Sequence, residues 1–191
     1  MKILSVHIGH DSSATVLENG KVVFYQVEER LSREKHSIYA EFLVNRLIEL
    51  NHLEFDLAII SCLDPRPGVE EGSYGRRIFE GFKSGYPFKI KEVIYDDLNH
   101  HREHLYASFY HSGFDEALCF ILDGAGSRLP LAGVEGYCRE IETVYHMTKE
   151  GDKVLFKHYH NEGLIKKPAI ENGNVKISGE PSVGWLFEDG R

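Results

Sequence analysis

The sequence predicts an α/β protein in which a mixed sheet is flanked by helices. Three observations support this prediction. A turn centred on Asn19-Gly20 joins two stretches that read as the strands of a β-hairpin. Apolar side chains in residues 39–50 recur at helical spacing. Two short apolar runs are typical of buried strands: 57–62, which lies between Asp56 and Asp64, and 117–122, which ends at Asp123.

The predicted elements follow one order along the chain, β-β-β-helix-β-helix-β. This is the order of the ribonuclease H-like lobe, which recurs in the actin, sugar kinase and Hsp70 superfamily. Residues 64–88 hold several glycines among charged and aromatic residues, which predicts a long functional or mobile insertion with one short helix near 76–82. The elements are strands at 2–8, 14–17 and 22–27, a helix at 39–50, strands at 57–62 and 90–95, a helix at 100–111, a strand at 117–122, and a hairpin of 143–148 and 154–160.

Composition narrows the functional classes. The 191 residues carry 22 basic and 30 acidic side chains, a net charge of −8, which disfavours broad binding to nucleic acid or anionic membranes but is compatible with a local basic pocket. Mean hydropathy is −0.32, and no apolar run approaches the roughly 20 residues of a membrane span. Three cysteines without a CxxC pair indicate a reducing compartment. We therefore expect a cytoplasmic protein without nucleic-acid or membrane partners.

Two histidines on the predicted helix at 100–111 suggest a metal centre. His100 and His104 are four residues apart, so their imidazoles lie one turn apart on the same face, a spacing suited to one metal ion. Asp123 follows a strongly apolar strand and is a candidate third ligand. Two imidazoles and a carboxylate with open positions favour Fe(II), Mn or Zn over Mg or Ca. The alternative is a solvated polar face of the helix.

A second polar cluster, Gly9-His10-Asp11-Ser12-Ser13, lies where the first strand turns into the second. Such a cluster at a strand end suits a phosphate or an acyl group, and His10 can move a proton near neutral pH. The alternative is an ordinary hairpin turn in which Asp11 and Ser12 cap their own backbone.

Three further features carry weaker signals. The turn 123–126 can place a carboxylate and backbone N–H groups beside a ligand, or it is a tight exit from the strand. The cations Arg30, Arg33 and Lys35 form a solvated connection or hold a phosphate-like group. The histidines of the last hairpin are interpreted as surface residues: His146, His158 and His160.

Taken together, these segments resemble the amino-terminal part of the O-carbamoyltransferases of the nodulation and antibiotic-tailoring type. Their order and separation match across nearly the whole chain. The matching segments are 3–14 (ILSVHIGHDSSA), 19–23 (NGKVV), 28–36 (EERLSREKH), 100–109 (HHREHLYASF), 112–117 (SGFDEA), 122–126 (LDGAG) and 182–188 (SVGWLFE).

The resemblance implies metal-dependent transfer of a carbamoyl group to a hydroxyl of a sugar, glycan or similar acceptor. The donor would be carbamoyl phosphate, which ATP converts to carbamoyl-adenylate. The implied metal is Fe²⁺, with Mn²⁺ or Zn²⁺ as alternatives, and its ligands are His100, His104 and Asp123. The other implied roles are His10 as the base on the acceptor hydroxyl, Asp11 and Lys35 at the transfer centre, and Ser12, Arg33, Gly124 and Gly126 around the adenylate or acceptor.

The sequence differs from that family in two respects, and these differences affect what we expect of residues 1–191. Residues 127–130 (SRLP) stand where the family has Glu and a Thr-rich stretch, and the sequence ends shortly after 182–188. We therefore expect residues 1–191 to be the amino-terminal lobe of a longer enzyme, with a second lobe and an adenylate-forming domain in the same chain or in a partner. The alternatives are a non-catalytic metal- or anion-binding module that acts with a partner chain, and a stand-alone metal-dependent hydrolase.

Overall fold

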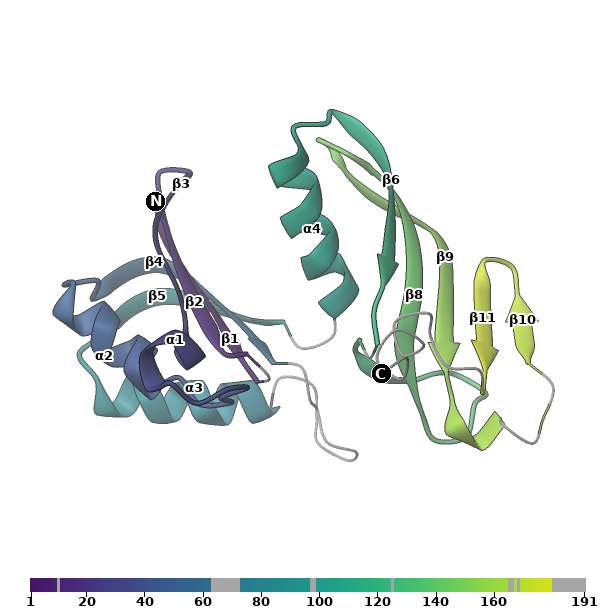
Figure 1. Ribbon diagram of the computed structural model, residues 1–191, viewed down its shortest axis with the longest axis horizontal. Helices are drawn as coiled ribbons and strands as arrows, with labels where there is room; N and C mark the ends of the chain where they lie inside the picture. The colour runs from purple at the N-terminus through teal and green to yellow at the C-terminus, as the bar shows by residue number, and fades with distance from the viewer. Residues whose placement is uncertain are drawn as a thin grey trace. The chain divides into compact units, whose positions relative to one another are not determined.

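The computed structural model describes residues 1–9, 11–62, 73–96, 99–124, 126–164, 167 and 169–179. The chain forms two compact units, Met1–Asp97 and Leu98–Arg191, each built on one mixed sheet (Figure 1). Within the described ranges, no helix has the length and apolar character needed to cross a membrane.

The first unit contains a five-stranded sheet of order β3-β2-β1-β4-β5. β1, β2 and β3 are antiparallel neighbours, and β4 and β5 extend β1 in parallel. This is the ribonuclease H-like strand order, so the predicted fold class is confirmed. The elements are β1 (Lys2–Ile8), β2 (Ser13–Glu18), β3 (Lys21–Val27), α1 (Glu28–Ser32), α2 (Glu41–Glu49), β4 (Glu54–Cys62), α3 (Ser73–Gly85) and β5 (Lys89–Asp96).

The predicted Asn-Gly turn joins β2 to β3. Asn19 and Gly20 have φ angles of 52° and 80°. Two consecutive positive values are the type I′ geometry, whose twist matches that of the flanking strands.

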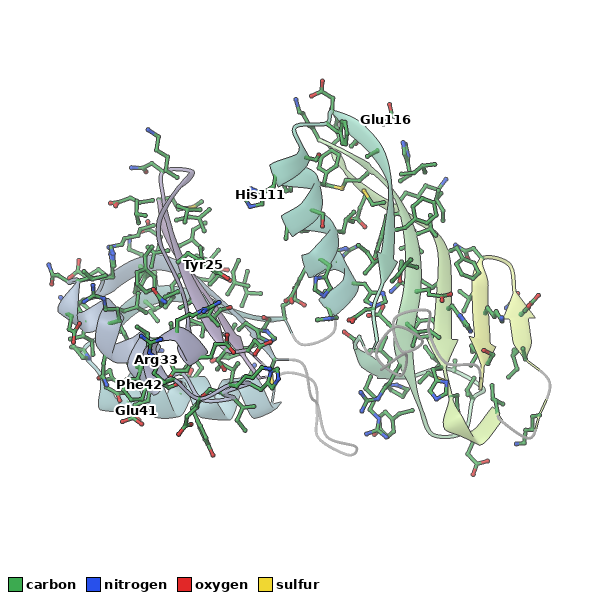
Figure 2. The ribbon with its side chains drawn as sticks, viewed as in Figure 1. Tyr25, Arg33, Glu41, Phe42, His111 and Glu116 are labelled. Carbon is green, nitrogen blue, oxygen red and sulfur yellow. The ribbon has the colours of Figure 1, made fainter. Side chains whose placement is uncertain are left out.

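Helices α1, α2 and α3 cover one face of the first sheet (Figure 1). Alternate residues of β1 are buried on that face, where Leu4 belongs to the same core as Leu43 of α2 and Phe79 of α3. Alternation along a strand places every second side chain on the same face. Tyr25 and Phe42 lie outside this core and are exposed (Figure 2).

Helix α3 is longer than the short helix predicted near residues 76–82 and links the parallel strands β4 and β5. The Phe79 ring packs edge-on against the Tyr95 ring, with centroids 6.4 Å apart. The glycine-rich composition made the predicted helix too short, because glycine weakens the helical signal in a sequence. Residues 63–72 of the predicted insertion lie outside the described residues.

The second unit contains a six-stranded sheet of order β10-β11-β9-β8-β6, with β7 paired to β8. The sequence predicts a single mixed sheet to which the strand at 117–122 belongs, and this is wrong because that strand lies in a second sheet. The strand is β6, which pairs antiparallel with β8. An apolar run predicts a buried strand but does not specify its partner. The elements are α4 (His100–Ser112), β6 (Glu116–Leu122), β7 (Arg128–Pro130), β8 (Tyr137–Thr148), β9 (Gly151–His160), the 3-10 helix η1 (Glu162–Leu164), β10 (Ile170–Asn172) and β11 (Val175–Ser178).

Helix α4 packs on one face of the second sheet (Figure 1). Leu105 and Phe109 of the helix form a core with Ile121 of β6 and with Tyr145 and Met147 of β8. The alternate residues of β6 lie on the other face, where Leu118, Phe120 and Leu122 are exposed.

Two histidines of the β8–β9 hairpin are buried, which corrects their prediction as surface residues. His158 and His160 are both buried. The His158 ring lies 3.0 Å from Glu142 Oε2 through Nδ1 and 2.6 Å from Ser178 Oγ through Nε2. Strand β9 lies between β8 and β11, which encloses this part of the hairpin. His146 is partly exposed and lies 2.6 Å from Glu116 Oε1.

Candidate metal centre

The second unit brings the three predicted metal ligands together. His100 and His104 project from the first two turns of α4, and Asp123 directly follows β6. His100 Nε2 lies 2.7 Å from Asp123 Oδ2 and 2.9 Å from His104 Nε2. His104 Nε2 and Asp123 Oδ2 are 3.9 Å apart. Metal bonds of about 2.1 Å at right angles put neighbouring donors about 3 Å apart, so a small adjustment would seat one ion.

The arrangement of hydrogen atoms among these three side chains also favours a cation. His100 Nε2 lies within hydrogen-bond distance of two groups, Asp123 Oδ2 and His104 Nε2. In neutral His100 this nitrogen carries at most one hydrogen, which the two neighbouring groups must share. Without that hydrogen, the lone pair of His100 Nε2 faces the Asp123 carboxylate, even when His104 donates its own hydrogen to His100. A metal ion in place of that hydrogen would satisfy all three donor atoms at once.

The charge states of the ligands suit this role. The hydrogen bond from His100 and the positive charge on His100 and His104 hold the pKa of Asp123 at about 2, with further help from the Gly124 backbone N–H. Burial, and secondarily the charge on His100, lowers the pKa of His104. An ionised carboxylate and a neutral imidazole are the ligating forms of these groups.

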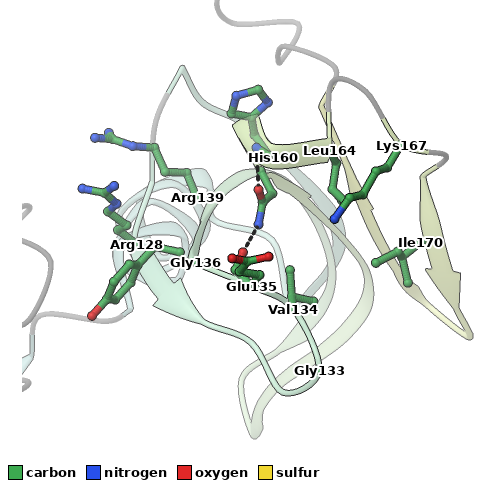
Figure 3. Close-up of a pocket in the computed structure, with 13 residues that line it drawn as sticks. Arg128, Gly133, Val134, Glu135, Gly136, Arg139, His160, Leu164, Lys167 and Ile170 are labelled. Atoms are coloured by element: carbon green, nitrogen blue, oxygen red, sulfur yellow. Dashed lines mark hydrogen bonds between the residues drawn. The ribbon is translucent and has the colours of Figure 1, made fainter.

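One wall of a cavity in the second unit lies close in sequence to the metal ligand Asp123. Ser127 Oγ accepts a hydrogen bond from the His100 backbone N–H at 3.2 Å, and β7 starts at the next residue, Arg128. Arg128 and Arg139 line a cavity of about 620 Å³ (Figure 3). Ser127 therefore connects the first turn of α4 to a wall of this cavity.

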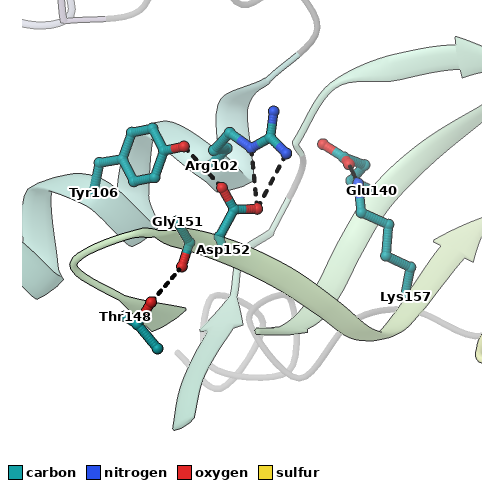
Figure 4. Close-up of polar contacts among 7 residues, drawn as sticks. All are labelled: Arg102, Tyr106, Glu140, Thr148, Gly151, Asp152 and Lys157. Carbon is teal, nitrogen blue, oxygen red and sulfur yellow. Dashed lines mark hydrogen bonds and ion pairs between the residues drawn. The ribbon is translucent and has the colours of Figure 1, made fainter. Parts of the chain in front are cut away.

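The helix that carries both histidines is fastened to the sheet by polar contacts. Arg102 donates to Asp152 Oδ2 through Nε at 3.3 Å and through a terminal nitrogen at 3.1 Å (Figure 4). Tyr106 donates to Asp152 Oδ1 at 2.8 Å. A two-nitrogen contact to one carboxylate restricts orientation as well as distance. These contacts fix the direction in which α4 presents its histidines.

His101 and Gly126 form the packed support beneath the centre. His101 is fully buried, its Nδ1 lies 2.7 Å from Thr143 Oγ1, and burial together with the charge on His100 lowers its pKa to about 3. A Cβ on Gly126 would lie 2.6 Å from His101 Nε2. Gly126, which the resemblance assigns to ligand binding, thus permits a close approach between the turn after β6 and the buried imidazole.

In the first unit, Ser12 of the predicted polar cluster holds the turn between β1 and β2. Ser12 is fully buried; its Oγ donates to the Gly9 carbonyl at 3.0 Å and accepts from the Gly9 N–H at 3.2 Å. Its backbone also joins Ser37 and Glu28. This is the turn-capping arrangement that the sequence left open as the alternative. His10, the predicted base, lies outside the described residues.

The cations predicted to hold an anion are exposed. Arg33 ends α1 in the left-handed conformation, with φ of 65°, and Lys35 follows in the connection to α2. Nearby, Asp11, Glu29 and His36 each place one potential ligand atom within 4.8 Å of the others. Sequence reasoning did not find this second cluster, because its residues come from two turns and the short helix α1 and share no spacing motif.

Sequence reasoning also missed the role of Glu28. This carboxylate is buried and accepts hydrogen bonds from the backbone N–H groups of Phe42 at 3.1 Å and Leu43 at 2.9 Å. The N-terminus of α2 has no side-chain cap of its own, because Ala40 occupies that position. Glu28 therefore caps α2 from α1. The missing Ser, Thr, Asp or Asn before α2 is the sequence signal that a distant cap is required.

Comparisons with known proteins give fold-level similarity at most. No protein-family model matches the chain, and no curated protein does. Among solved structures, YeaZ from Pseudomonas aeruginosa matches 92% of this chain and 74% of its own at 10% identity, with a TM-score of 0.41. A protein from the same organism, described as uncharacterized and similar to peptidase YEAZ, matches 100% and 93% at 11% identity and a TM-score of 0.42. The resemblance to the carbamoyltransferases therefore stays a prediction.

Proposed function

We propose that this chain supplies the metal centre of a carbamoyltransferase. His100, His104 and Asp123 would bind one divalent transition-metal ion, with Fe²⁺ as the expected metal. The complete enzyme would transfer a carbamoyl group from carbamoyl phosphate, through carbamoyl-adenylate made with ATP, to a hydroxyl of a sugar or similar acceptor. The observation that carries the proposal is the convergence of these three donor atoms on one point.

The donor set and its setting support this function. Two imidazole nitrogens and one carboxylate oxygen leave coordination positions open, as a metal that acts on a substrate requires. The bound metal would supply Lewis-acid stabilisation of phosphate oxygens. The contacts of α4 with Asp152 would keep both histidines in position. Positioning of this kind reduces the reorganisation needed during reaction.

The roles proposed for the first unit rest on the carbamoyltransferase resemblance. His10 would accept the proton of the acceptor hydroxyl, because a hydroxyl is a weak nucleophile until a base removes its proton. Asp11 and Lys35 would bind the acceptor or the adenylate. Ser12 would hold the turn that carries His10, consistent with its hydrogen bonds to Gly9.

The test measures metal content and carbamoyl transfer together. The chain is loaded with Fe²⁺ without oxygen, combined with a separately prepared adenylate-forming carbamoyltransferase domain, and given ¹³C-carbamoyl phosphate, ATP and a panel of monosaccharides. We expect metal-dependent formation of the sugar carbamate, detected by mass spectrometry. His104→Ala should remove both the metal and the product. His111→Ala, an exposed histidine in the last turn of the same helix, is the matched control.

The other outcomes separate the alternatives. Carbamate formation that is equal with and without metal contradicts the proposal. Metal-dependent phosphate release that needs no acceptor favours the hydrolase. Stoichiometric metal without turnover on any acceptor favours a non-catalytic module.

A further inference from the structure

Three cationic or titratable side chains form a row across the second sheet. Arg128 of β7 lies directly opposite Arg139 of β8, and Arg139 lies opposite His160 of β9. Residues directly opposite on antiparallel strands lie on the same face with their Cβ atoms about 5 Å apart. The two arginines therefore extend from neighbouring positions, side by side, as Figure 3 shows.

The positive charges of Arg128 and Arg139 repel each other unless an anion binds between them. Like charges directly opposite each other destabilise a strand pair. Both arginines are half-buried, which reduces the screening available from water. Within the described residues, no carboxylate lies within 4.0 Å of either guanidinium, although Glu135 lines the same cavity. Arg128 lies over the Tyr137 ring at 5.3 Å, which offsets part of the repulsion.

The cavity lined by Arg128 and Arg139 also has a polar residue that links two of its loops and an apolar side. Asn161 is buried and links two of its loops: its amide donates to the Glu135 carbonyl at 3.1 Å, and its side-chain oxygen accepts from the Gly163 N–H at 2.8 Å. Val134 and Leu164 give one side of the cavity an apolar surface. A volume of about 620 Å³ is within the range of small-molecule sites.

We propose that this cavity binds a small organic phosphate. The phosphate would lie against Arg128 and Arg139, whose guanidinium groups match its oxygens in pairs. Lys167, which lines the cavity, would add a further positive charge. The organic portion of the ligand would contact Val134 and Leu164. This site uses none of the metal ligands and stands independently of the proposed carbamoyl transfer.

The test is calorimetric titration of the metal-free chain in the presence of EDTA. Phenyl phosphate is the probe, inorganic phosphate measures the anion alone, and benzoate tests whether a carboxylate suffices. We expect 1:1 binding of phenyl phosphate, with inorganic phosphate and benzoate each about tenfold weaker or more. Arg139→Gln should weaken phenyl phosphate binding at least about tenfold. Lys153→Gln removes an exposed cation from β9, outside the cavity, and should have no effect.

Two further measurements separate loss of the site from loss of the fold and from the metal centre. Arg139→Gln relieves repulsion, so its Tm in phosphate-free buffer should equal or exceed that of the wild type, while the rise in Tm caused by phenyl phosphate should disappear. His104→Ala should bind phenyl phosphate normally. The proposal is overturned if the wild type shows no saturable binding up to about 10 mM, if benzoate binds equally well, or if the Arg128→Gln/Arg139→Gln double variant binds as tightly as the wild type.

Discussion

Each unit holds a cluster of potential metal ligands, and the two clusters differ in how they are supported. His100, His104 and Asp123 come from one helix and one strand end, with side chains 14%, 53% and 29% exposed. Asp11 and His36 come from turns and Glu29 from the short helix α1, and the Asp11–His36 contact is 3.3 Å long with both side chains about half exposed. Both Asp11 and His36 have positive φ angles, of 63° and 59°.

The comparison teaches that ligand chemistry alone does not make a metal centre. Both clusters offer imidazole and carboxylate donors of the types that transition metals accept. All three ligands of the first cluster lie on α4 or directly after β6, and α4 is anchored through Asp152 and Ser127. Two of the three residues in the second cluster lie on turns. Exposed side chains on turns, such as Asp11 and His36, must be ordered when the ion binds, and that ordering costs free energy. We therefore expect the cluster in the second unit to bind much more tightly.

The largest expected effect is a loss of metal affinity when one carboxylate is removed from the cluster of the second unit. Asp123→Asn removes the only carboxylate of the first cluster and should weaken binding of Fe²⁺ or Zn²⁺ by more than about 100-fold. Asp11→Asn makes the same chemical change in the other cluster and should leave the affinity unchanged. Competition titrations with a chromophoric chelator measure both. An equal loss of affinity in the two variants would remove the distinction between the clusters.

The second prediction concerns acid stability of the metal-free chain and the support beneath the centre. The unfolded chain protonates His101 near pH 6.5, but the folded chain does so only near pH 3, so the unfolded state binds more protons between these values. Stability should therefore fall as pH drops through this window, by up to about 1.4 kcal/mol per pH unit. Urea unfolding in EDTA at several pH values measures the slope. His101→Gln should flatten it, and an unchanged slope would show that His101 is not the responsible group.

The third prediction concerns the close contact between Gly126 and the buried His101 ring. Gly126→Ala should lower the free energy of unfolding by about 1–3 kcal/mol, because the new Cβ would meet the buried His101 ring. Gly81→Ala is the control, since a Cβ there has open space within α3 and should raise helix stability by about 0.5–1 kcal/mol. Thermal and chemical unfolding measure both. A neutral Gly126→Ala would show that the turn can move away.

A smaller effect is expected in the scaffold of the first unit. Glu28→Ala leaves the N–H groups of Phe42 and Leu43 without their acceptor and should cost about 1–3 kcal/mol. The exposed Glu34→Ala should change stability by no more than about 0.5 kcal/mol. Equal unfolding midpoints in urea for the two variants would contradict the capping role of Glu28.

Sequence reasoning predicted the features that depend on local spacing. The Asn19-Gly20 turn follows from the positive φ angles that a two-residue hairpin requires. The clustering of His100 and His104 follows from the helical repeat, and the approach of Asp123 follows from its position at a strand end. Each of these inferences needs only a few neighbouring residues.

The features that were missed depend on partners distant in sequence. The apolar run that became β6 gave no indication that it would pair with β8 rather than extend the first sheet. Glu28 caps a helix that begins 13 residues later, and Arg128 meets Arg139 only because β7 folds back on β8. His158 is buried by strands on both sides of β9. Such contacts are set by tertiary pairing, which residue spacing does not encode.

X-ray absorption at the metal edge tests the central claim most directly. The chain is loaded with one equivalent of Fe²⁺ and its coordination shell is measured. Binding at His100, His104 and Asp123 predicts two imidazole ligands at about 2.1 Å, with the remaining positions filled by oxygen. His104→Ala should reduce the bound metal to a small fraction. A shell with one imidazole would place the ion at Asp11, Glu29 and His36, and a shell with none would contradict a histidine-based centre altogether.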